Sequence, residues 1–298
     1  MNIIKYKWAY LIFSLLVLVP GIISLITYGL NLSIDFTGGS VFLYQFTSLV
    51  NKDDLKKVFE ENSVSVENIS VDISNKTIVR TKSVDADTSE KVKNAISQQL
   101  PDAKLLSFET VGPVVGRETT KNAFVALTWA SIGILLYIAY AFRNVPKPYS
   151  SFRFGASAVI AMLHDALVVL GIFSILGHFH KIEVDSLFIT AVLTVIGFSV
   201  HDTIVVFDRI RENLRKLPGN WGFEEIVNYS LVETLNRSLA TSLTVIFTLS
   251  ALFVLGGESI KTFVLALLIG IVSGTYSSIF NATPILVIWE ERVMRKRK

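Results

Sequence analysis

The chain has 298 residues, of which 51% are hydrophobic and 18% are charged, and its net charge at pH 7 is +3. A disordered protein is excluded, because such chains are poor in apolar residues. A soluble globular domain is disfavoured, because about a quarter of its residues would be charged. The chain has no cysteine, which excludes disulfides, thiolate metal sites and cysteine catalysis. The small net charge gives no reason to expect a nucleic-acid partner.

The apolar residues are concentrated in six blocks, each as long as the roughly 20 residues that a helix needs to cross a bilayer core. Four blocks contain no Asp, Glu, Lys or Arg: residues 8–28, 122–142, 238–257 and 262–289. The other two contain one acid each, Asp165 in residues 154–177 and Asp202 in residues 186–207. The sequence therefore predicts a polytopic α-helical membrane protein with six transmembrane helices. A cleaved signal peptide is disfavoured, since no A-x-A-like site follows the first block.

Lys and Arg are distributed unevenly between the two sides of these blocks. Fifteen lie near the two ends of the chain or in the loops after the second and fourth blocks, against two, Lys181 and Lys261, in the other short loops. Because cytoplasmic loops carry the excess of Lys and Arg, we expect both termini in the cytoplasm. Residues 1–29 then form the N-terminus and helix 1, residues 30–120 lie outside, and residues 121–298 form helices 2–6, cytoplasmic loops and a basic tail.

Residues 30–120 have the pattern of a small α+β domain. The expected elements are strands at 39–46, 69–73, 77–82 and 103–110 and helices at 51–62 and 87–100. Asp87 is the expected cap of the second helix. The order β-α-β-β-α-β is the ferredoxin-like arrangement. The segment contains no nucleophile–base pair and no His, so we expect a binding or force-bearing module and not an enzyme.

Asp165 and Asp202 are the leading candidates for function, because an ionised side chain at the bilayer centre costs about 2.5–3.5 kcal/mol even on the most lenient scale. Small and polar residues share or adjoin their helical faces: Ser157, Ala161, Thr194, Ser199 and Thr203. We interpret the two acids as a proton or ion relay. The alternative is a buried hydrogen bond that locks two helices together.

Arg237 lies where the fifth block begins. If that helix starts one turn earlier than the charge-free run, Arg237 lies within the membrane and can pair with Asp202. Protonation of the acid would then release the arginine, which makes a switch. The alternative is an ordinary cytoplasmic anchor whose charged end reaches the interface.

His164 and His201 each precede one of the two acids. Such dipeptides occur in metal hydrolases, but those sites need further ligands, and neighbouring helix residues point about 100° apart. His178 and His180, in a short loop, are more readily explained as part of a membrane interface than as a metal site. We expect no metal and no cofactor.

Glycine motifs lie at both ends of the outside segment. Asp35, Gly38 and Gly39 come at its start, and Gly112, Pro113 and Gly116 at its end. The first motif lacks the helix and lysine of a phosphate-binding loop, so we interpret it as a turn or hinge. Glycines at both joints suit rigid-body motion of the domain.

The last block carries small residues at every fourth position: Ala266, Gly270, Gly274, Ser278 and Ala282. Such a stripe allows two helices to approach closely. The partner helix can belong to this chain or to another chain.

Together these motifs resemble the SecF family of the bacterial SecD–SecF protein-export complex. The resemblance is carried by residues 34–39, 111–118, 197–213 and 233–238, and the six-span layout extends it to the whole chain. It implies the membrane fold of the resistance–nodulation–division superfamily, with Asp202 and Arg237 in the proton pathway. His201 stands where relatives often have Asn.

The resemblance also implies partners and a location. The partners would be a SecD-like six-span subunit, the SecYEG channel, exported unfolded polypeptide and protons. The location would be the bacterial cell membrane. The implied task is to help pull secreted chains from the channel at the expense of the proton gradient, without covalent chemistry on the substrate.

Three alternatives stay open at this point. The first is a half-size, proton-driven exporter of lipids or hydrophobic compounds, which would need a substrate pocket. The second is an intramembrane aspartyl protease built on Asp165 and Asp202, but its Gly-x-Gly-Asp run is missing. The third is a structural scaffold, for which Asp202→Asn would be silent.

Overall fold

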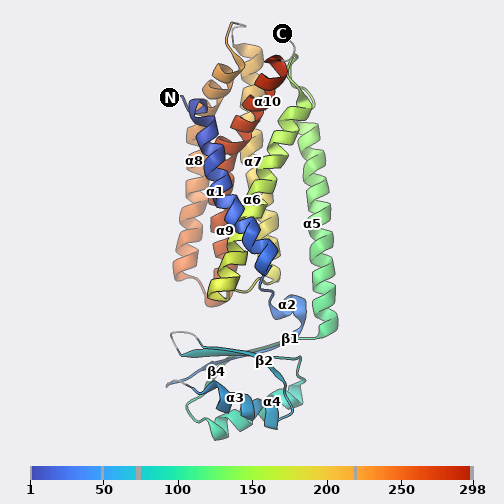
Figure 1. Cartoon of the computed structure of the whole chain (residues 1–298), viewed down its shortest axis with the longest axis vertical. Helices are drawn as coiled ribbons and strands as arrows, with labels where there is room; N and C mark the ends of the chain where they lie inside the picture. The colour runs from blue at the N-terminus through green and yellow to red at the C-terminus, as the bar shows by residue number, and fades with distance from the viewer. Residues whose placement is uncertain (1, 48–49, 72–74, 218–219, 296–298) are drawn as a thin grey trace. The chain divides into compact units, whose positions relative to one another are not determined.

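The computed structural model describes residues 2–47, 50–71, 75–217 and 220–295. The chain divides into two compact units (Figure 1). We call Leu32–Phe124 the insert unit, and Met1–Asn31 together with Val125–Lys298 the membrane unit. Residues 296–298 of the predicted basic tail lie outside the described residues.

Six helical spans among the described residues are long and apolar enough to cross a membrane, which confirms the predicted number. They are α1 (Lys7–Tyr28), preceded by the 3-10 turn η1 (Ile4–Tyr6), then α5 (Pro113–Ala141), α6 (Ser151–His180), α7 (Ser186–Lys216), α8 (Phe223–Leu255), and a last span of α9 (Glu258–Ser277), the π-helix η2 (Ser278–Ala282) and α10 (Thr283–Arg295). Pro20 lies inside α1, as membrane helices tolerate.

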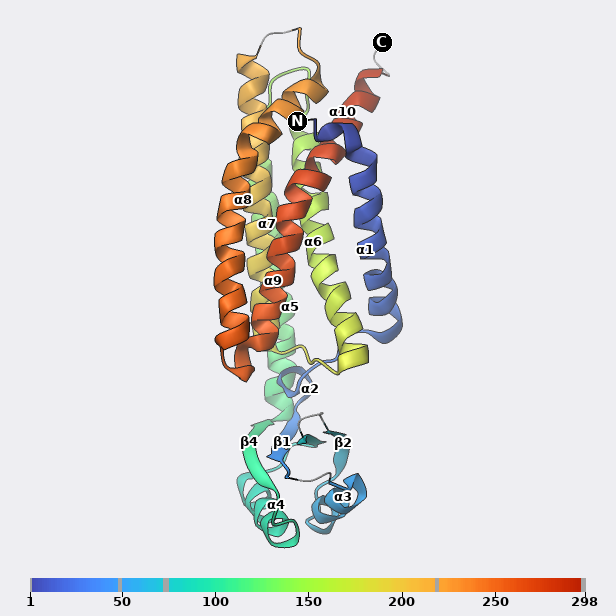
Figure 2. The ribbon, with the colours of Figure 1, turned by 90° about the vertical axis from the view of Figure 1, so that its left-hand side faces the viewer.

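Close helix contacts hold the membrane unit together. Helix α6 packs against α1, α7 and α9, and α8, α9, α6 and α1 follow one another across the bundle in Figure 2. A Cβ atom built on Gly171 of α6 would lie 2.6 Å from the Cα atom of Gly21 of α1. The backbones of these two helices therefore touch, which only glycine permits.

The stripe of small residues in the last span packs inside this chain. Gly270 faces Val195 of α7, and Gly274 faces Ser199 one turn further along the same helix. Ala266 and Ala282 are fully buried. The sequence left open whether the stripe packs against a helix of this chain or of another chain. In the structure it packs against α7 of the same chain.

Helices α5 and α8 leave much of their apolar surface uncovered. Trp129 is 70% exposed, Phe247 68% and Leu255 85%. Soluble monomers rarely expose large contiguous apolar patches to water. These side chains accordingly face lipid or another protein chain.

The insert unit contains a four-stranded sheet and three helices. Its elements are α2 (Ile34–Thr37), β1 (Gly39–Gln45), α3 (Lys52–Glu61), β2 (Val66–Val71), β3 (Lys76–Thr81), α4 (Ala86–Gln99) and β4 (Lys104–Val111). The strand order is β2-β3-β1-β4, and every neighbouring pair is antiparallel. From β1 to β4 the elements follow in the β-α-β-β-α-β order of a ferredoxin-like domain. Residues 72–73 of the strand predicted at 69–73 lie outside the described residues.

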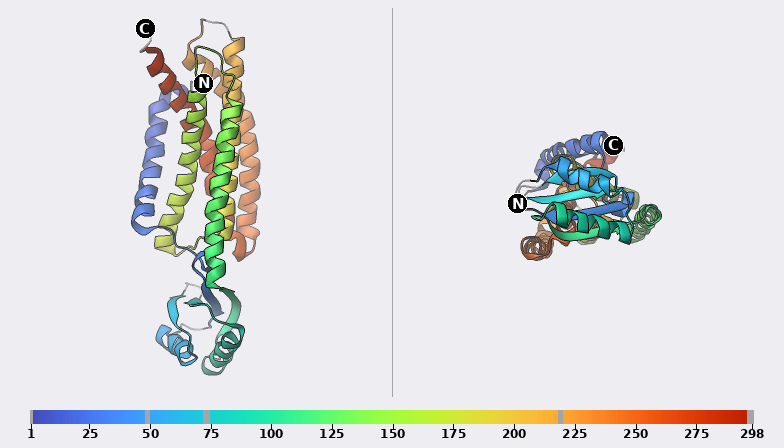
Figure 3. Two further views of the ribbon diagram at one scale, coloured as in Figure 1. Left: turned by 90° about the vertical axis from the view of Figure 1, so that its right-hand side faces the viewer. Right: turned by 90° about the horizontal axis from the view of Figure 1, so that it is seen from below.

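Helices α3 and α4 cover one face of this sheet (Figure 3). Alternate residues of β1, Phe42 and Tyr44, point into the core, as the period of a strand requires. Phe42 packs edge-on against Phe59 of α3, with ring centroids 5.2 Å apart. Ile96 brings α4 into the same cluster.

The cap of α4 is Asp85 and not Asp87, so this prediction was wrong. The Asp85 carboxylate accepts the backbone N–H of Thr88 at 2.8 Å, which is the usual spacing between a cap and the third helical residue. Asp87 lies in the first turn. Hydrogen bonds from Thr88 hold the pKa of Asp85 below its usual range.

Candidate functional site

Asp202 is buried in the middle of α7, with 3% of its surface exposed. Its Oδ2 atom accepts a hydrogen bond from the hydroxyl of Ser238 on α8 at 2.9 Å. One turn further along α8, the buried Ser242 accepts a hydrogen bond from Thr275 of α9 at 2.7 Å. Asp202 therefore lies where α7 meets a hydroxyl-rich part of α8 and α9.

Asp165 on α6 is fully buried and has more partners than Asp202. Three serine hydroxyls donate to its carboxylate: Ser199 of α7 at 2.5 Å, Ser273 of α9 at 2.7 Å and Ser277 of α9 at 2.5 Å. A buried carboxylate is tolerated when such hydrogen bonds satisfy its oxygens. The predicted face of Ser157, Ala161 and Asp165 is wholly buried, as expected.

The His164 ring folds back toward its neighbour, contrary to the expectation that adjacent side chains diverge. Its Nδ1 atom lies 3.0 Å from Oδ1 of Asp165. The direction of the Cα–Cβ bonds differs by about 100°, but Nδ1 is close enough to the backbone to reach the next side chain. Among the described residues the buried Nε2 atom has no hydrogen-bond partner.

The two acids occupy separate hydrogen-bonded sites. Asp202 bonds to Ser238, whereas Asp165 bonds to hydroxyls of α7 and α9. Ser199, which we expected beside Asp202, donates to Asp165 instead. An aspartyl protease needs two carboxylates that share one site and one proton, and no described hydrogen bond joins these two.

Arg237 does not pair with Asp202 in this structure. Its side chain is exposed, and within the described residues it makes no ion pair or side-chain hydrogen bond. Asp202 bonds to Ser238, the residue that follows Arg237. The two side chains point in different directions, because consecutive residues of a helix project about 100° apart. Arg237 instead lines a cavity of about 370 Å³ between α7 and α8.

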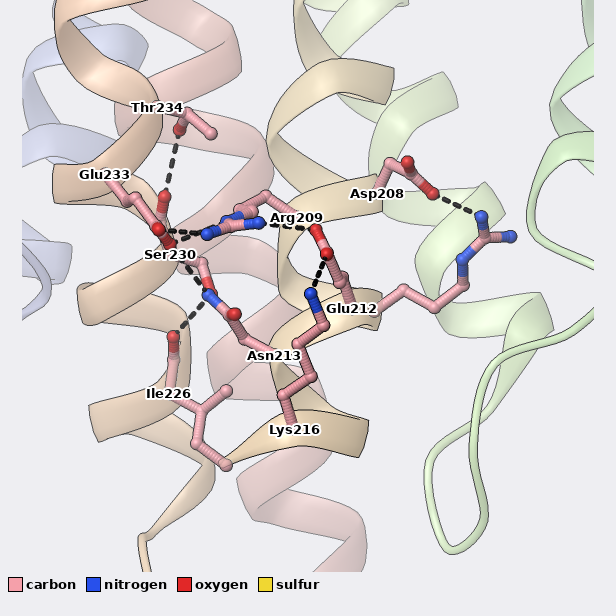
Figure 4. A network of polar contacts seen from close by, with 10 residues as sticks. Asp208, Arg209, Glu212, Asn213, Lys216, Ile226, Ser230, Glu233 and Thr234 are labelled. Carbon is pink, nitrogen blue, oxygen red and sulfur yellow. Dashed lines mark hydrogen bonds and ion pairs between the residues drawn. The ribbon is translucent and has the colours of Figure 1, made fainter. Parts of the chain in front are cut away.

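Three charged residues that line this cavity, Arg209, Glu212 and Glu233, belong to a network of polar contacts between α7 and α8 (Figure 4). Arg209 of α7 pairs with Glu233 of α8 and also with Glu212 of its own helix. Lys216 holds the other oxygen of Glu212 at 2.5 Å. Asn213 donates to Glu233 at 3.1 Å. Of the two arginines that line the cavity, Arg209 is paired twice, and Arg237 has no ion pair with the part of the chain that the structure describes.

The charge asymmetry explains Arg209 and Lys216 only as topology signals, and it does not predict this network. The spacing of Arg209 to Glu212 and of Glu212 to Lys216 is i,i+3 and i,i+4, which places side chains side by side on a helix. That signal predicts the pairs within α7. The pair between Arg209 and Glu233 joins two helices, and spacing alone does not indicate it.

The two glycine motifs pack against each other inside the insert unit. A Cβ atom on Gly38 would lie 3.0 Å from the Cα atom of Pro113, and one on Gly116 would lie 2.8 Å from the backbone nitrogen of Gly38. The Thr120 hydroxyl donates to the carbonyl of Phe36 at 3.3 Å. The missing side chains of these glycines permit this close contact, and Gly38 has φ +72°. The hinge role stays a prediction.

The other motif residues fit this joint. Gly39 has φ +126°, and a Cβ atom there would lie 2.8 Å from the carbonyl oxygen of Thr81. Asp35 lies in the first turn of α2, where the helix dipole favours an acid. Gly112 has open space around it, and its carbonyl accepts the N–H of Gly116 at 3.0 Å.

Comparison with known proteins places the chain in a family. The profile described as "Protein export membrane protein SecD/SecF, C-terminal" matches residues 89–292, and the profile "SecD/SecF GG Motif" matches residues 23–48. The chain belongs to the SecD/SecF family. It is 48% identical to the protein translocase subunit SecF of Thermobaculum terrenum over 98% of this chain and 94% of that protein.

Two SecDF proteins are also similar to this chain, and both are longer than it. The protein translocase subunit SecDF of Bacillus subtilis is 36% identical over 96% of this chain and 38% of its own. The crystal structure of SecDF from Thermus thermophilus, described as a translocon-associated membrane protein, is 32% identical with a TM-score of 0.83, over 98% of this chain and 39% of its own. The chain therefore spans about two fifths of each SecDF protein.

Membership in the SecD/SecF family confirms the resemblance seen in the sequence. It also confirms the fold class, a polytopic helical membrane protein with the resistance–nodulation–division-like fold of SecDF. Together with the six apolar spans, it identifies a multi-pass protein of the bacterial membrane.

Proposed function

We propose that this chain is an accessory subunit of protein export that couples the proton gradient to translocation of secreted polypeptides through the Sec channel. Family membership supports the export role. The observation that supports proton coupling is Asp202, an ionisable side chain that is buried in a membrane helix and accepts a hydrogen bond from the hydroxyl of Ser238. Moving one charge through the membrane potential is worth about 2.3 kcal/mol per 100 mV, enough to bias a two-state element.

In this proposal Asp202 takes up a proton from one side of the membrane and releases it to the other. Apolar surroundings favour the neutral acid, and a nearby cation favours the carboxylate. The present surroundings of Asp202 are a serine hydroxyl and packed helices. Arg237, the residue before Ser238, supplies the cation when the helices shift.

Asp165 is a second candidate in the relay. It joins α6 to α7 and α9 through three hydroxyls, and His164 extends its hydrogen bonds. The alternative role is a structural lock between these helices. Asp165→Asn keeps the size of the side chain and tests whether ionisation is needed.

The partners and orientation also belong to the proposal. Because the chain matches only about two fifths of the two SecDF proteins, we propose that a separate SecD-like six-span subunit supplies the rest. The SecYEG channel and the exported unfolded polypeptide would be the further partners. The excess of Lys and Arg supports cytoplasmic termini and an insert unit outside the cell membrane.

Motion of the insert unit would transmit force to the exported chain. The proposed pivots are the glycine motifs at the two ends of this unit, Gly38 and Gly39 at one joint and Gly112 and Gly116 at the other. A crosslink that tethers the insert unit to an external loop should stop export and leave assembly intact. Normal export with complete crosslinking would refute the moving unit.

The decisive experiment is Asp202→Asn, which keeps size and hydrogen bonding but cannot ionise. Inverted membrane vesicles that carry the variant should insert it and bind its partner normally, yet lose the export stimulated by the proton gradient. Asp102→Asn, the same change at an exposed position of the insert unit, is the matched control. Full gradient-dependent export with Asp202→Asn would show that the residue is structural.

A further inference from the structure

Arg237 shares its cavity with an acid that already has a partner, Glu233. The two residues are four apart on α8, so their side chains are neighbours on one helix face. Both line the cavity between α7 and α8. Within the described residues Arg237 has no counterion, although Glu233 is one helical turn away.

Glu233 is held from α7 by a partner that can release it. Arg209 donates through Nε to Oε2 of Glu233 at 2.6 Å and through a second guanidinium nitrogen to Oε1. The third nitrogen of Arg209 donates to Glu212 at 2.5 Å. Arg209 therefore keeps a counterion when it leaves Glu233. Asn213, which is buried, keeps one Glu233 oxygen in place at 3.1 Å.

We infer that Glu233 is the second counterion of Arg237. The Arg237 guanidinium pairs with Asp202 when that acid is ionised and moves to Glu233 when Asp202 is protonated. Arg209 competes with Arg237 for Glu233 and so sets how readily Arg237 leaves Asp202. Leaving a charge without a partner near the membrane interior is costly, and the second counterion removes that cost. This inference rests on the proposed proton relay.

Few other charged groups face Asp202. His201 precedes it on α7, and Asp165 of α6 lies in a separate hydrogen-bonded site with Ser199. Residues 262–277 of helix α9 contain no acid and no base, and this stretch carries the hydroxyl of Thr275. Beyond Arg237, α8 presents only Ser238 and Ser242. Arg237 is thus the mobile cation through which changes at Glu233 can reach Asp202.

The test measures the protonation of Asp202 directly. A hydrophobic carbodiimide reacts with protonated carboxyl groups in membranes, and mass spectrometry of the modified peptide gives the labelled fraction of Asp202 at each pH. Glu233→Gln removes the second counterion and keeps Arg237 on Asp202, so the labelling midpoint should fall. Arg209→Gln frees Glu233 for Arg237, so the midpoint should rise. We expect about half a pH unit or more each way, roughly a threefold change in the ratio of protonated to ionised acid.

Opposite shifts from the two members of one ion pair distinguish a switch from a structural contact. Arg209→Lys, which keeps the charge but loses the planar fork, should give a smaller shift in the direction of Arg209→Gln. Glu291→Gln removes an acid that pairs with Lys7 elsewhere in the bundle and should leave the midpoint unchanged. Shifts in the same direction, or none, overturn the switch and leave the relay intact. Absence of pH-dependent labelling of Asp202 in the unmodified protein overturns both.

Discussion

Gly270→Ala should destabilise the membrane unit, because α9 and α7 touch at this position. The added Cβ atom would lie 2.1 Å from one methyl carbon of Val195 and 2.6 Å from the other. Carbon atoms in contact are normally about 3.5–4.0 Å apart, so the overlap with the nearer methyl is about 1.4 Å. Val195 cannot rotate away cheaply, since a β-branched side chain has one preferred rotamer in a helix.

The helices must therefore separate, and this separation also weakens a hydrogen bond of Asp165. Overpacking of this kind typically costs about 1–3 kcal/mol. Two turns along α9, Ser277 donates to Asp165 at 2.5 Å, and displacement of α9 lengthens this bond. We expect the free energy of unfolding of the purified chain in nanodiscs to fall by about 1–3 kcal/mol.

Unfolding by denaturant, followed by tryptophan fluorescence, measures this change. Gly197→Ala on α7 is the matched control, because a Cβ atom there has nothing within 4 Å. Val195→Ala should partly rescue Gly270→Ala in a double-mutant cycle, since it removes both methyl groups. If Gly270→Ala costs no more than Gly197→Ala, the close approach of α7 and α9 is not the reason for a glycine.

Three further predictions concern the insert unit. Tyr44→Phe should raise its free energy of unfolding by about 1 kcal/mol or more, because the buried Tyr44 hydroxyl lacks a hydrogen-bond partner among the described residues; an unchanged denaturation midpoint would contradict this. The bonds from Thr88 lower the pKa of Asp85, so their stabilisation is present above the unfolded value of about 3.9 and is lost as pH falls through the lower folded value. The protection factors of the amides in the first turn of α4, taken relative to their intrinsic exchange rates, should therefore fall in acid, and in Asp85→Ala they should already be low at neutral pH. Cysteines at the exposed positions Ser63 and Ser97 should react with an impermeant maleimide in intact cells, and labelling only after the membrane is opened would refute an outside location.

The parts of the fold that follow from local sequence could be predicted. Six spans follow from runs without charge, and the buried face of Ser157, Ala161 and Asp165 follows from helical spacing. The element order of the insert unit follows from alternation and from turn residues. Each of these signals lies within one helix or one strand.

The assignment of donors to acids could not be predicted, because it depends on how each helix is rotated. Ser199 was expected beside Asp202 and bonds to Asp165. Ser238 and not Arg237 reaches Asp202, although the two residues are adjacent in the chain. Ser277 lies 112 residues from Asp165 along the chain, and spacing gives no indication of such a contact.

The glycine motifs illustrate the same limit. A glycine permits either a flexible turn or a close approach, and the sequence does not distinguish these two uses. Gly38 and Gly116 are far apart along the chain, so their contact becomes visible only in the folded unit. The structure shows close approach at both glycines and φ +72° at Gly38, and the hinge role stays a prediction.

Helix α7 carries one contact at each of the three places on which the proposed relay depends. Ser199 connects it to Asp165 of α6, Asp202 connects it to Ser238 of α8, and Arg209 connects it to Glu233. Asp202 lies three residues after Ser199, which is about 4.5 Å along the helix axis, and Arg209 lies seven residues after Asp202, which is about 10.5 Å. A rigid shift of α7 therefore cannot change the surroundings of Asp202 without straining the bonds of Ser199 and Arg209. Under the proposed relay, protonation of Asp202 must either move α7 as a whole or act through the side chain of Arg237, and only the second route leaves the hydroxyl bonds of Asp165 unchanged.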